Sequence, residues 1–465
     1  MDVSDRKPEF EYRKYVYMSS KMAYPPGPRG LPVIGNTVDL SRDILEFYEQ
    51  LRDEYGRVAS YEVFGTDACM VAHPNAIQQV LLDNHEAFEK GEVLTRNLSD
   101  TMGEGLFLTG GDQWQNQRTQ IQPAFYRNRL NTYVPEMRAT AAETVEQWRD
   151  GMVVDVNDWM TETTIAVLGR TLFGVDVTEN PVISESSDAI LARFDTSRFW
   201  SFLPDRLPTP TNRRYRRKLT ELQTFVDELA DRRREQQPEN RGDDLLSILV
   251  NFVEASDLTQ EELRDNIVTF LFAGHETTAL GLTYTLLCLA QHPDEQAKLQ
   301  AEVNAVCEGV VTAESLPELE RLEHVIDEAL RLYPPVYMFF REATQDVELQ
   351  GFDIPAGTTL VIPQWAVHRD SKWWDDPETF RPERFISDTD RPEYAYFPFG
   401  GGPRHCIGMR FARMEMKVVL ATILSEYTFE LASNPDPDLI ASTNLKPGEP
   451  IEIKLRNDDA EEMIR

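Results

Sequence analysis

Cysteine is scarce in this chain of 465 residues: there are four, and they are widely separated. No two of them form the closely spaced pair that structural zinc sites and thioredoxin-like motifs use. So few cysteines exclude a disulfide framework and are typical of a reducing compartment. We therefore expect a cytoplasmic protein that is stabilised by its core rather than by crosslinks.

Long apolar runs are absent near the N-terminus. Residues 1–24 are polar and charged, with no segment suited to a signal peptide or a membrane span. The next residues, 24–36, are rich in proline and stiff. We expect a polar N-terminal extension over residues 1–24, no membrane anchor and a soluble protein.

Basic residues are also few compared with acidic ones. The chain has 79 acidic and 47 basic residues, a formal net charge of −32 and a pI near 4.6. A surface of this sign repels nucleic acid and anionic membranes, so we expect no nucleic-acid partner. Because the acidic residues are spread along the chain, they repel one another unless salt screens them. We interpret the composition as adaptation to a salt-rich cytoplasm; the alternative is an acidic protein in an ordinary cytosol.

One short segment combines a cysteine, four glycines and a cation, Phe399-Gly-Gly-Gly-Pro-Arg404-His-Cys406-Ile-Gly408. The thiolate is the form of cysteine that binds metals. Arg404, nearby backbone N–H groups and the start of a helix would all favour it at Cys406. Helical spacing of apolar residues predicts that this helix begins at Ile407. The glycines would let the loop pass closely under a flat ligand, and Phe399 is placed to shield the sulfur.

This pattern, F-x-x-G-x-R-x-C-x-G, resembles the haem-binding loop of the cytochrome P450 family, with every defined position filled. The family uses its cysteine as the axial thiolate ligand of the haem iron. The resemblance implies haem b (iron protoporphyrin IX) as cofactor, Cys406 as metal ligand, and Phe399, Arg404 and Gly408 as further cofactor-binding residues. Taken alone, the cysteine has another interpretation, an ordinary thiol in a glycine turn.

A long helix is predicted over residues 259–292, from a Thr-x-x-Glu capping box to a terminal His-Pro. The sequence A-G-H-E-T at its centre resembles the family's oxygen-activation motif. The resemblance implies that Ala273 and Gly274 border the haem and leave room for a diatomic ligand. It also implies that Glu276 and Thr277 are catalytic residues that relay protons. The alternative is a threonine bonded to its own helix and a surface glutamate.

Two further sites are implied for the haem propionates. Trp114 and Arg118 lie four residues apart and share one helix face, and W-x-x-x-R resembles the family's propionate-binding helix. Arg341 matches the family's second propionate arginine. An exposed arginine is the alternative for Arg118.

Glu328-x-x-Arg331 and Arg384 resemble the family's buried network of three ions, which stabilises the fold rather than catalysing a reaction. Between them, Val336 and Met338 are expected to face substrate. The segment 194–207 is expected to cover the substrate pocket.

The resemblance implies a mainly α fold with a small β-rich part, the cytochrome P450 fold, as one domain over residues 25–465. Haem would lie between the long central helix and the helix after the cysteine loop. The implied enzyme is a monooxygenase that inserts one atom of O₂ into a small apolar substrate by hydroxylation or epoxidation. Its electrons would come from a separate donor such as a ferredoxin and its reductase, docking near Arg410 and Arg413. With the charge, the resemblance points to a halophilic archaeon. A peroxygenase or isomerase of the same fold and a non-enzymatic haem sensor are the alternatives.

Overall fold

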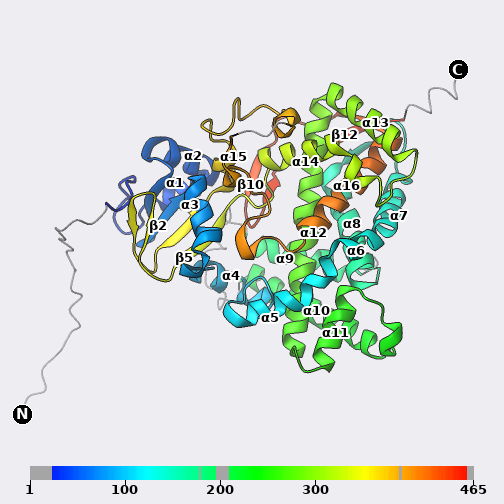
Figure 1. Cartoon of the computed structure of the whole chain (residues 1–465), viewed down its shortest axis with the longest axis horizontal. Helices are drawn as coiled ribbons and strands as arrows, with labels where there is room; N and C mark the ends of the chain where they lie inside the picture. The colour runs from blue at the N-terminus through cyan, green and yellow to red at the C-terminus, as the bar shows by residue number, and fades with distance from the viewer. Residues whose placement is uncertain (1–22, 177–179, 195–208, 387–389, 458–465) are drawn as a thin grey trace, which may run out of the picture.

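Helices form most of the molecule and a small sheet lies at one side of it (Figure 1). The computed structural model describes residues 23–176, 180–194, 209–386 and 390–457. Residues 195–207 of the expected pocket cover and residues 1–22 of the expected extension lie outside this part. The predicted fold class, mainly α with a small β-rich part, is confirmed.

The central helix, α12 (Gln260–Gln291), is 32 residues long and so spans about 48 Å. The predicted capping box is present: Thr259 accepts from the Glu262 N–H, and the Glu262 carboxylate accepts from the N–H of Thr259. Helices α8, α10, α14 and α16 pack against α12, so α12 is buried on nearly all sides. The helices are α1 (Thr37–Arg42), α2 (Ile44–Tyr55), α3 (Pro74–Gln78), α4 (Glu92–Met102), α5 (Gly111–Ile121), α6 (Arg127–Leu130), α7 (Val134–Val145), α8 (Val156–Leu168), α9 (Val182–Phe194), α10 (Pro210–Arg234), α11 (Leu245–Glu254), α12, α13 (Pro293–Cys307), α14 (Glu320–Leu332), α15 (Gln364–His368) and α16 (Met409–Glu426).

The largest sheet has five strands in the order β1-β2-β8-β5-β3. Strands β1 and β2 form its first hairpin, with a two-residue turn, Phe64-Gly65, between the paired residues Val63 and Thr66. Both turn residues have positive φ, as a two-residue hairpin turn requires. The strands are β1 (Val58–Val63), β2 (Thr66–Val71), β3 (Phe88–Glu89), β4 (Val153–Asp155), β5 (Phe339–Ala343), β6 (Val347–Leu349), β7 (Phe352–Ile354), β8 (Thr359–Ile362), β9 (Thr428–Leu431), β10 (Leu439–Ala441), β11 (Leu445–Pro447) and β12 (Glu452–Arg456).

Two small sheets place C-terminal strands beside the helices. Strands β4, β12 and β9 form one sheet, and β10 and β11 form a hairpin. The hairpin is tied to α12, since the Tyr284 hydroxyl donates to the Leu445 carbonyl at 2.9 Å. It therefore brings the C-terminal part of the chain to the middle of the central helix.

The helix after the cysteine loop begins later than predicted. It starts at Met409 rather than Ile407, and Gly408 is its N-cap residue. The Met409 N–H bonds the Cys406 carbonyl at 3.4 Å, so residues 407 and 408 form a turn ahead of the helix. The cysteine is therefore two residues outside the helix and faces its first N–H groups.

Candidate functional site

The cysteine loop carries the one exposed cysteine among the four; Cys69, Cys288 and Cys307 are buried. The Cys406 N–H donates to the Phe399 carbonyl at 2.9 Å, which closes the loop on itself. Surrounding protein groups partly desolvate the thiol and thereby raise its pKa. The backbone N–H groups of Gly408 and Met409 and the charge of Arg118 act in the opposite direction.

The cation beside the sulfur differs from the predicted one. Arg118 is the arginine whose charge acts on Cys406. Its guanidinium also donates to the His405 carbonyl at 3.1 Å and lies 3.2 Å from His405 Nε2. Arg404 instead donates to the Thr109 carbonyl at 2.7 Å and stacks 4.0 Å from the centre of the Trp114 ring. Arg118, rather than Arg404, is therefore the arginine whose charge acts on the thiol, and Arg404 lies against Trp114.

The glycines of the loop serve packing against protein. Gly402 has φ of +64°, and a side chain there would overlap the carbonyl oxygen of Leu81, in the helical turn 79–83. A side chain at Gly401 would overlap the Tyr394 ring. The explanation expected from the sequence, clearance for a flat ligand, is therefore not needed for these two residues.

The middle of α12 has an open side and a buried side. Ala273 is exposed, and Gly274 and Thr277 are partly exposed. The Thr277 hydroxyl donates to the Ala273 carbonyl at 2.9 Å, four residues back along the helix. A Cβ on Gly274 would lie 2.7 Å from Leu168 Cδ1 of α8. The glycine therefore permits close packing with α8, and it remains partly exposed beside Ala273 on the open side.

Glu276 lies on the buried side and is 7% exposed. Its carboxylate accepts a hydrogen bond from Asn444 Nδ2 at 2.7 Å and is ion-paired with Lys446. Both partners come from the β10–β11 hairpin. Its neighbour His275 is buried and bonds the Leu271 carbonyl through Nδ1, so it is a packed polar residue.

Three cations, Lys90, Arg341 and Arg404, lie near one another with no acidic partner among the described residues. Lys90 lies 3.7 Å from the centre of the Phe107 ring, and Arg341 donates to the Phe340 carbonyl at 2.7 Å. Burial lowers the pKa of Arg341 to about 10. Burial together with the charges of Arg341 and Arg118 lowers that of Arg404 to about 10.

Lys90 was missed by sequence reasoning. Burial and the neighbouring charges of Arg341 and Arg404 place its pKa well below the usual value for lysine. No motif marks this residue, which follows β3 in the chain. Because three neighbouring cations without an acid are unfavourable, the cluster is suited to bind the carboxylates of a ligand.

The predicted ion network is confirmed. Glu328 and Arg331 are fully buried, and their charged groups form two hydrogen bonds of 2.7 and 2.9 Å. Arg384 Nε donates to the same carboxylate at 2.9 Å. This pairing compensates the burial of the charges.

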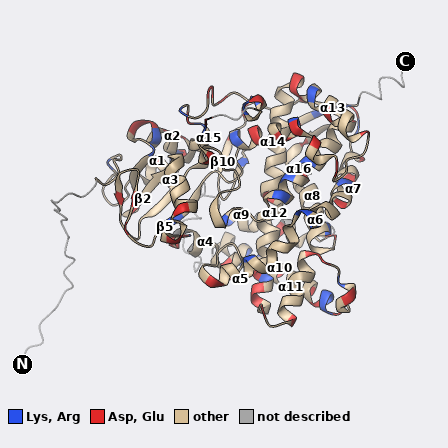
Figure 2. Ribbon diagram, in the orientation of Figure 1, with Lys and Arg blue, Asp and Glu red and all other residues tan. Residues whose placement is uncertain are grey.

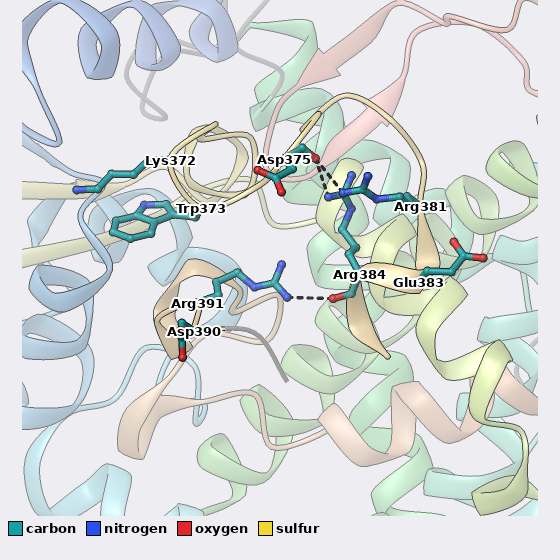
Figure 3. Close-up of a pocket in the computed structure, with 8 residues that line it drawn as sticks. All are labelled: Lys372, Trp373, Asp375, Arg381, Glu383, Arg384, Asp390 and Arg391. Carbon is teal, nitrogen blue, oxygen red and sulfur yellow. Dashed lines mark hydrogen bonds between the residues drawn. The ribbon is translucent and has the colours of Figure 1, made fainter. Parts of the chain in front are cut away.

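Arg384 also lines a surface pocket of about 520 Å³. Figure 3 shows its guanidinium directed to the Asp375 carbonyl, and its own carbonyl accepting from Arg391. The lining is a mixture of acidic and basic side chains. None of the predicted catalytic or cofactor-binding residues belongs to it.

The proposed basic docking patch after the cysteine loop is not supported at Arg413. Its guanidinium lies 2.6 Å from Asp327 and is also paired with Glu323, both of α14. These acids raise its pKa, and its side chain is only 22% exposed. Arg410 remains exposed. Arg413 therefore connects α16 to α14 and is not a free surface cation.

These features agree with a family comparison. A family model described as Cytochrome P450 matches residues 25–455. The chain belongs to the cytochrome P450 family. Membership gives haem as the cofactor, and together with the relatives below it identifies a cytochrome P450 monooxygenase.

Relatives from bacteria align over most of the chain. Pentalenene oxygenase of Streptomyces avermitilis is 34% identical over 419 residues, which are 89% of this chain and 92% of the relative. Cyclooctat-9-en-7-ol 5-monooxygenase of Streptomyces melanosporofaciens is 33% identical over 410 residues, covering 86% and 88%. A solved structure, retinoic acid bound cyanobacterial CYP120A1, has a TM-score of 0.85 and 28% identity. Its alignment covers 94% of this P450 and all of that chain.

No helix in the described part of the chain combines the length and the apolar character that crossing a bilayer requires.

Proposed function

We propose that this P450 is a haem-thiolate monooxygenase that hydroxylates or epoxidises a small apolar organic substrate with O₂. The observation that carries the proposal is the pairing of an exposed cysteine with a nearby group of cations that lack acids. A haem offers the matching groups, an iron for the thiolate and carboxylates for the cations. The residues present therefore fit haem b.

The proposed haem-binding residues come from three parts of the chain. Cys406 would bind the iron, with the N–H groups of Gly408 and Met409 stabilising its thiolate, and Phe399 packing on the same loop. Ala273 and Gly274 of α12 would border the opposite face. The propionates would bind the cation cluster, which consists of Lys90, Arg341 and Arg404, together with Trp114 and Arg118.

The bound haem would supply the activation and insertion of oxygen. The protein's own contribution to catalysis is to hold and move protons. Thr277 presents its hydroxyl on the open side of α12, and its oxygen can still accept a hydrogen bond while it donates to Ala273. Glu276, one residue earlier, would supply the acidic group of the relay.

The proposed substrate is apolar. The names of two relatives refer to pentalenene and to cyclooctat-9-en-7-ol, and the similar solved structure contains retinoic acid. Val336 and Met338 are partly buried and lie just before β5. We propose that these two residues face substrate.

Electrons would come from a separate protein, a ferredoxin with its reductase. Three buried free thiols support a reducing, cytoplasmic location. The net charge of −32 supports a halophilic source, such as an archaeon with a salt-rich cytoplasm.

The proposal is tested by identifying the protein ligand of the haem iron. Reduced, haem-loaded protein with carbon monoxide should show the strongly red-shifted Soret band of a thiolate ligand. Cys406→Ser should abolish this band, whereas Cys307→Ser, at a buried thiol, should retain it. A band that survives in Cys406→Ser would assign the ligand to another residue and remove the basis of the proposal.

A further inference from the structure

The β10–β11 hairpin engages both carboxylate oxygens of the buried acid on α12. Asn444 Nδ2 bonds Glu276 Oε2, and Lys446 Nζ is paired with Oε1. The Asn444 and Glu276 positions are 168 residues apart in the chain. The Lys446 side chain is 28% exposed and that of Glu276 only 9%, so Lys446 connects the acid to the surface of the protein.

The hairpin is fixed on two sides of the site. On one side the Tyr284 hydroxyl of α12 donates to the Leu445 carbonyl at 2.9 Å. On the other, the Leu445 N–H donates to the Pro335 carbonyl at 2.9 Å, and the Tyr337 hydroxyl to the Ser442 carbonyl at 2.8 Å. Lys446 is therefore presented to α12 by a well-anchored strand.

The charge of Lys446 matters because Glu276 is buried. A buried carboxylate is costly without a counter-charge. The other titratable group that faces it, His275, gives no positive charge, since burial lowers the pKa of that imidazole. Among the described residues, Lys446 is the cation paired with this carboxylate.

We propose that Lys446 is a positioning residue for proton delivery, which together with Asn444 holds the Glu276 carboxylate in place and supplies its counter-charge. This inference rests on the proposed function, in which Glu276 and Thr277 relay protons. Without Lys446 the buried carboxylate would lose its counter-charge and one of its two fixed contacts. Protons would then arrive late at the reduced dioxygen.

Late protons change the products of oxygen reduction. Complete reduction uses four electrons and four protons for each O₂ and gives two water molecules. Release after two electrons and two protons gives hydrogen peroxide. The fraction of consumed O₂ that is recovered as peroxide therefore reports proton delivery, and it can be measured without knowing the natural substrate.

The experiment uses the haem-loaded full chain with NADH, a surrogate ferredoxin and its reductase, and no added substrate. Lys446→Met should raise the peroxide fraction relative to water about threefold or more, a smaller effect than loss of a proton-transfer group itself because Lys446 acts through Glu276. Lys446→Arg should restore the wild-type ratio because it returns the cation. Lys454→Met, on β12, is the control and should match wild type. The carbon monoxide spectrum checks that each variant is folded, and Lys446→Gln replaces Lys446→Met if that variant does not fold.

The Glu276→Gln variant tests the relay role of Glu276 separately from the role of Lys446. If it leaves the ratio unchanged, the relay role of Glu276 is wrong and the inference is overturned with it. If Glu276→Gln raises the peroxide fraction and Lys446→Met does not, only the inference about Lys446 is overturned. Failure of Lys446→Arg to restore the ratio overturns it as well, since the effect would then come from packing.

Discussion

At the scale of single residues, the cation cluster destabilises the folded chain but is suited to bind the carboxylates of a ligand. Burial lowers the pKa values of Lys90, Arg341 and Arg404, and neighbouring positive charges further lower those of Lys90 and Arg404. A group that binds its proton less tightly when folded destabilises the folded state while it stays protonated. A bound carboxylate would offset this cost.

Arg341→Met should therefore stabilise the haem-free protein while weakening its hold on haem. Below the folded pKa of about 10, the wild-type arginine is charged and destabilising, and methionine removes that charge. We expect the free energy of unfolding to rise by about 1–3 kcal/mol, by conversion of the pKa shift. Urea unfolding of haem-free protein measures the change in stability. The rate of haem loss to an acceptor protein measures how firmly haem is held.

The exposed Arg410 supplies the control for Arg341. Arg410→Met should change neither quantity by more than the small amount usual for surface substitutions. If Arg341→Met destabilised the haem-free protein, or kept haem as firmly as wild type, Arg341 would not belong to a carboxylate-binding cluster.

Thr277→Ala should separate proton delivery from binding. The hydroxyl contacts the Ala273 carbonyl and no group of the cation cluster. Haem content and the carbon monoxide spectrum should therefore stay as in wild type. The share of electrons recovered as peroxide should rise several-fold, since a positioned proton-transfer group is worth about 10²–10⁴ in rate. Thr278→Ala, at the buried neighbouring position, is the control; an unchanged share in Thr277→Ala would remove this hydroxyl from the mechanism.

Prediction from sequence succeeded where function depends on neighbouring residues. The cysteine loop is one continuous segment, and its family pattern can be found without tertiary information. Lys90 and Lys446 could not be found, because their importance depends on contacts with residues far away in the chain. The same reason explains the error at Arg413, whose acidic partners on α14 precede it by more than eighty residues.

At the scale of elements, the approach of α8 to α12 decides which side of the central helix is open. Leu168 Cδ1 occupies the place that a side chain on Gly274 would need. Local signals predicted α12 well, since a capping box and a terminal His-Pro lie within its own sequence. The face that packs on α8 was not predicted, because it depends on the position of another helix.

Gly274→Ala should lower stability through this contact. The added methyl group would force Leu168 to move, and overpacking of this kind costs about 1–3 kcal/mol. The double variant Gly274→Ala with Leu168→Ala should lose less stability than the sum of the two single variants, because the smaller side chain makes room. Thermal or urea unfolding provides the comparison.

Gly408→Ala is the matched control for this contact. There a Cβ would meet Cys406 Sγ and Phe125 only at 3.9 Å, an ordinary distance. If Gly274→Ala were as stable as Gly408→Ala, or if the double variant were strictly additive, close packing would not be the reason for glycine at position 274.

At the scale of the whole molecule, several positive charges form ion pairs in the interior, and negative charges predominate at the surface. Arg331, Arg384 and Arg413 are paired with acids between elements. In Figure 2 the outer helices α5, α11 and α13 carry ribbon segments coloured for acidic residues. These internal pairs carry little net charge, so most of the net charge of −32 belongs to the rest of the chain.

Stability should therefore rise with salt. The Debye length falls from about 10 Å at 0.1 M to about 3 Å at 1 M, which screens repulsion between surface carboxylates and affects buried pairs much less. We expect the thermal unfolding midpoint at neutral pH to increase steadily as KCl is raised from 0.1 M to beyond 1 M. The control is the same titration near pH 4.6, the sequence pI, on protein that is still folded, where the net charge is close to zero and the increase should be much smaller. A midpoint that stayed constant with KCl at neutral pH would show that surface repulsion does not limit the stability of this P450, and that its acidic composition needs another explanation.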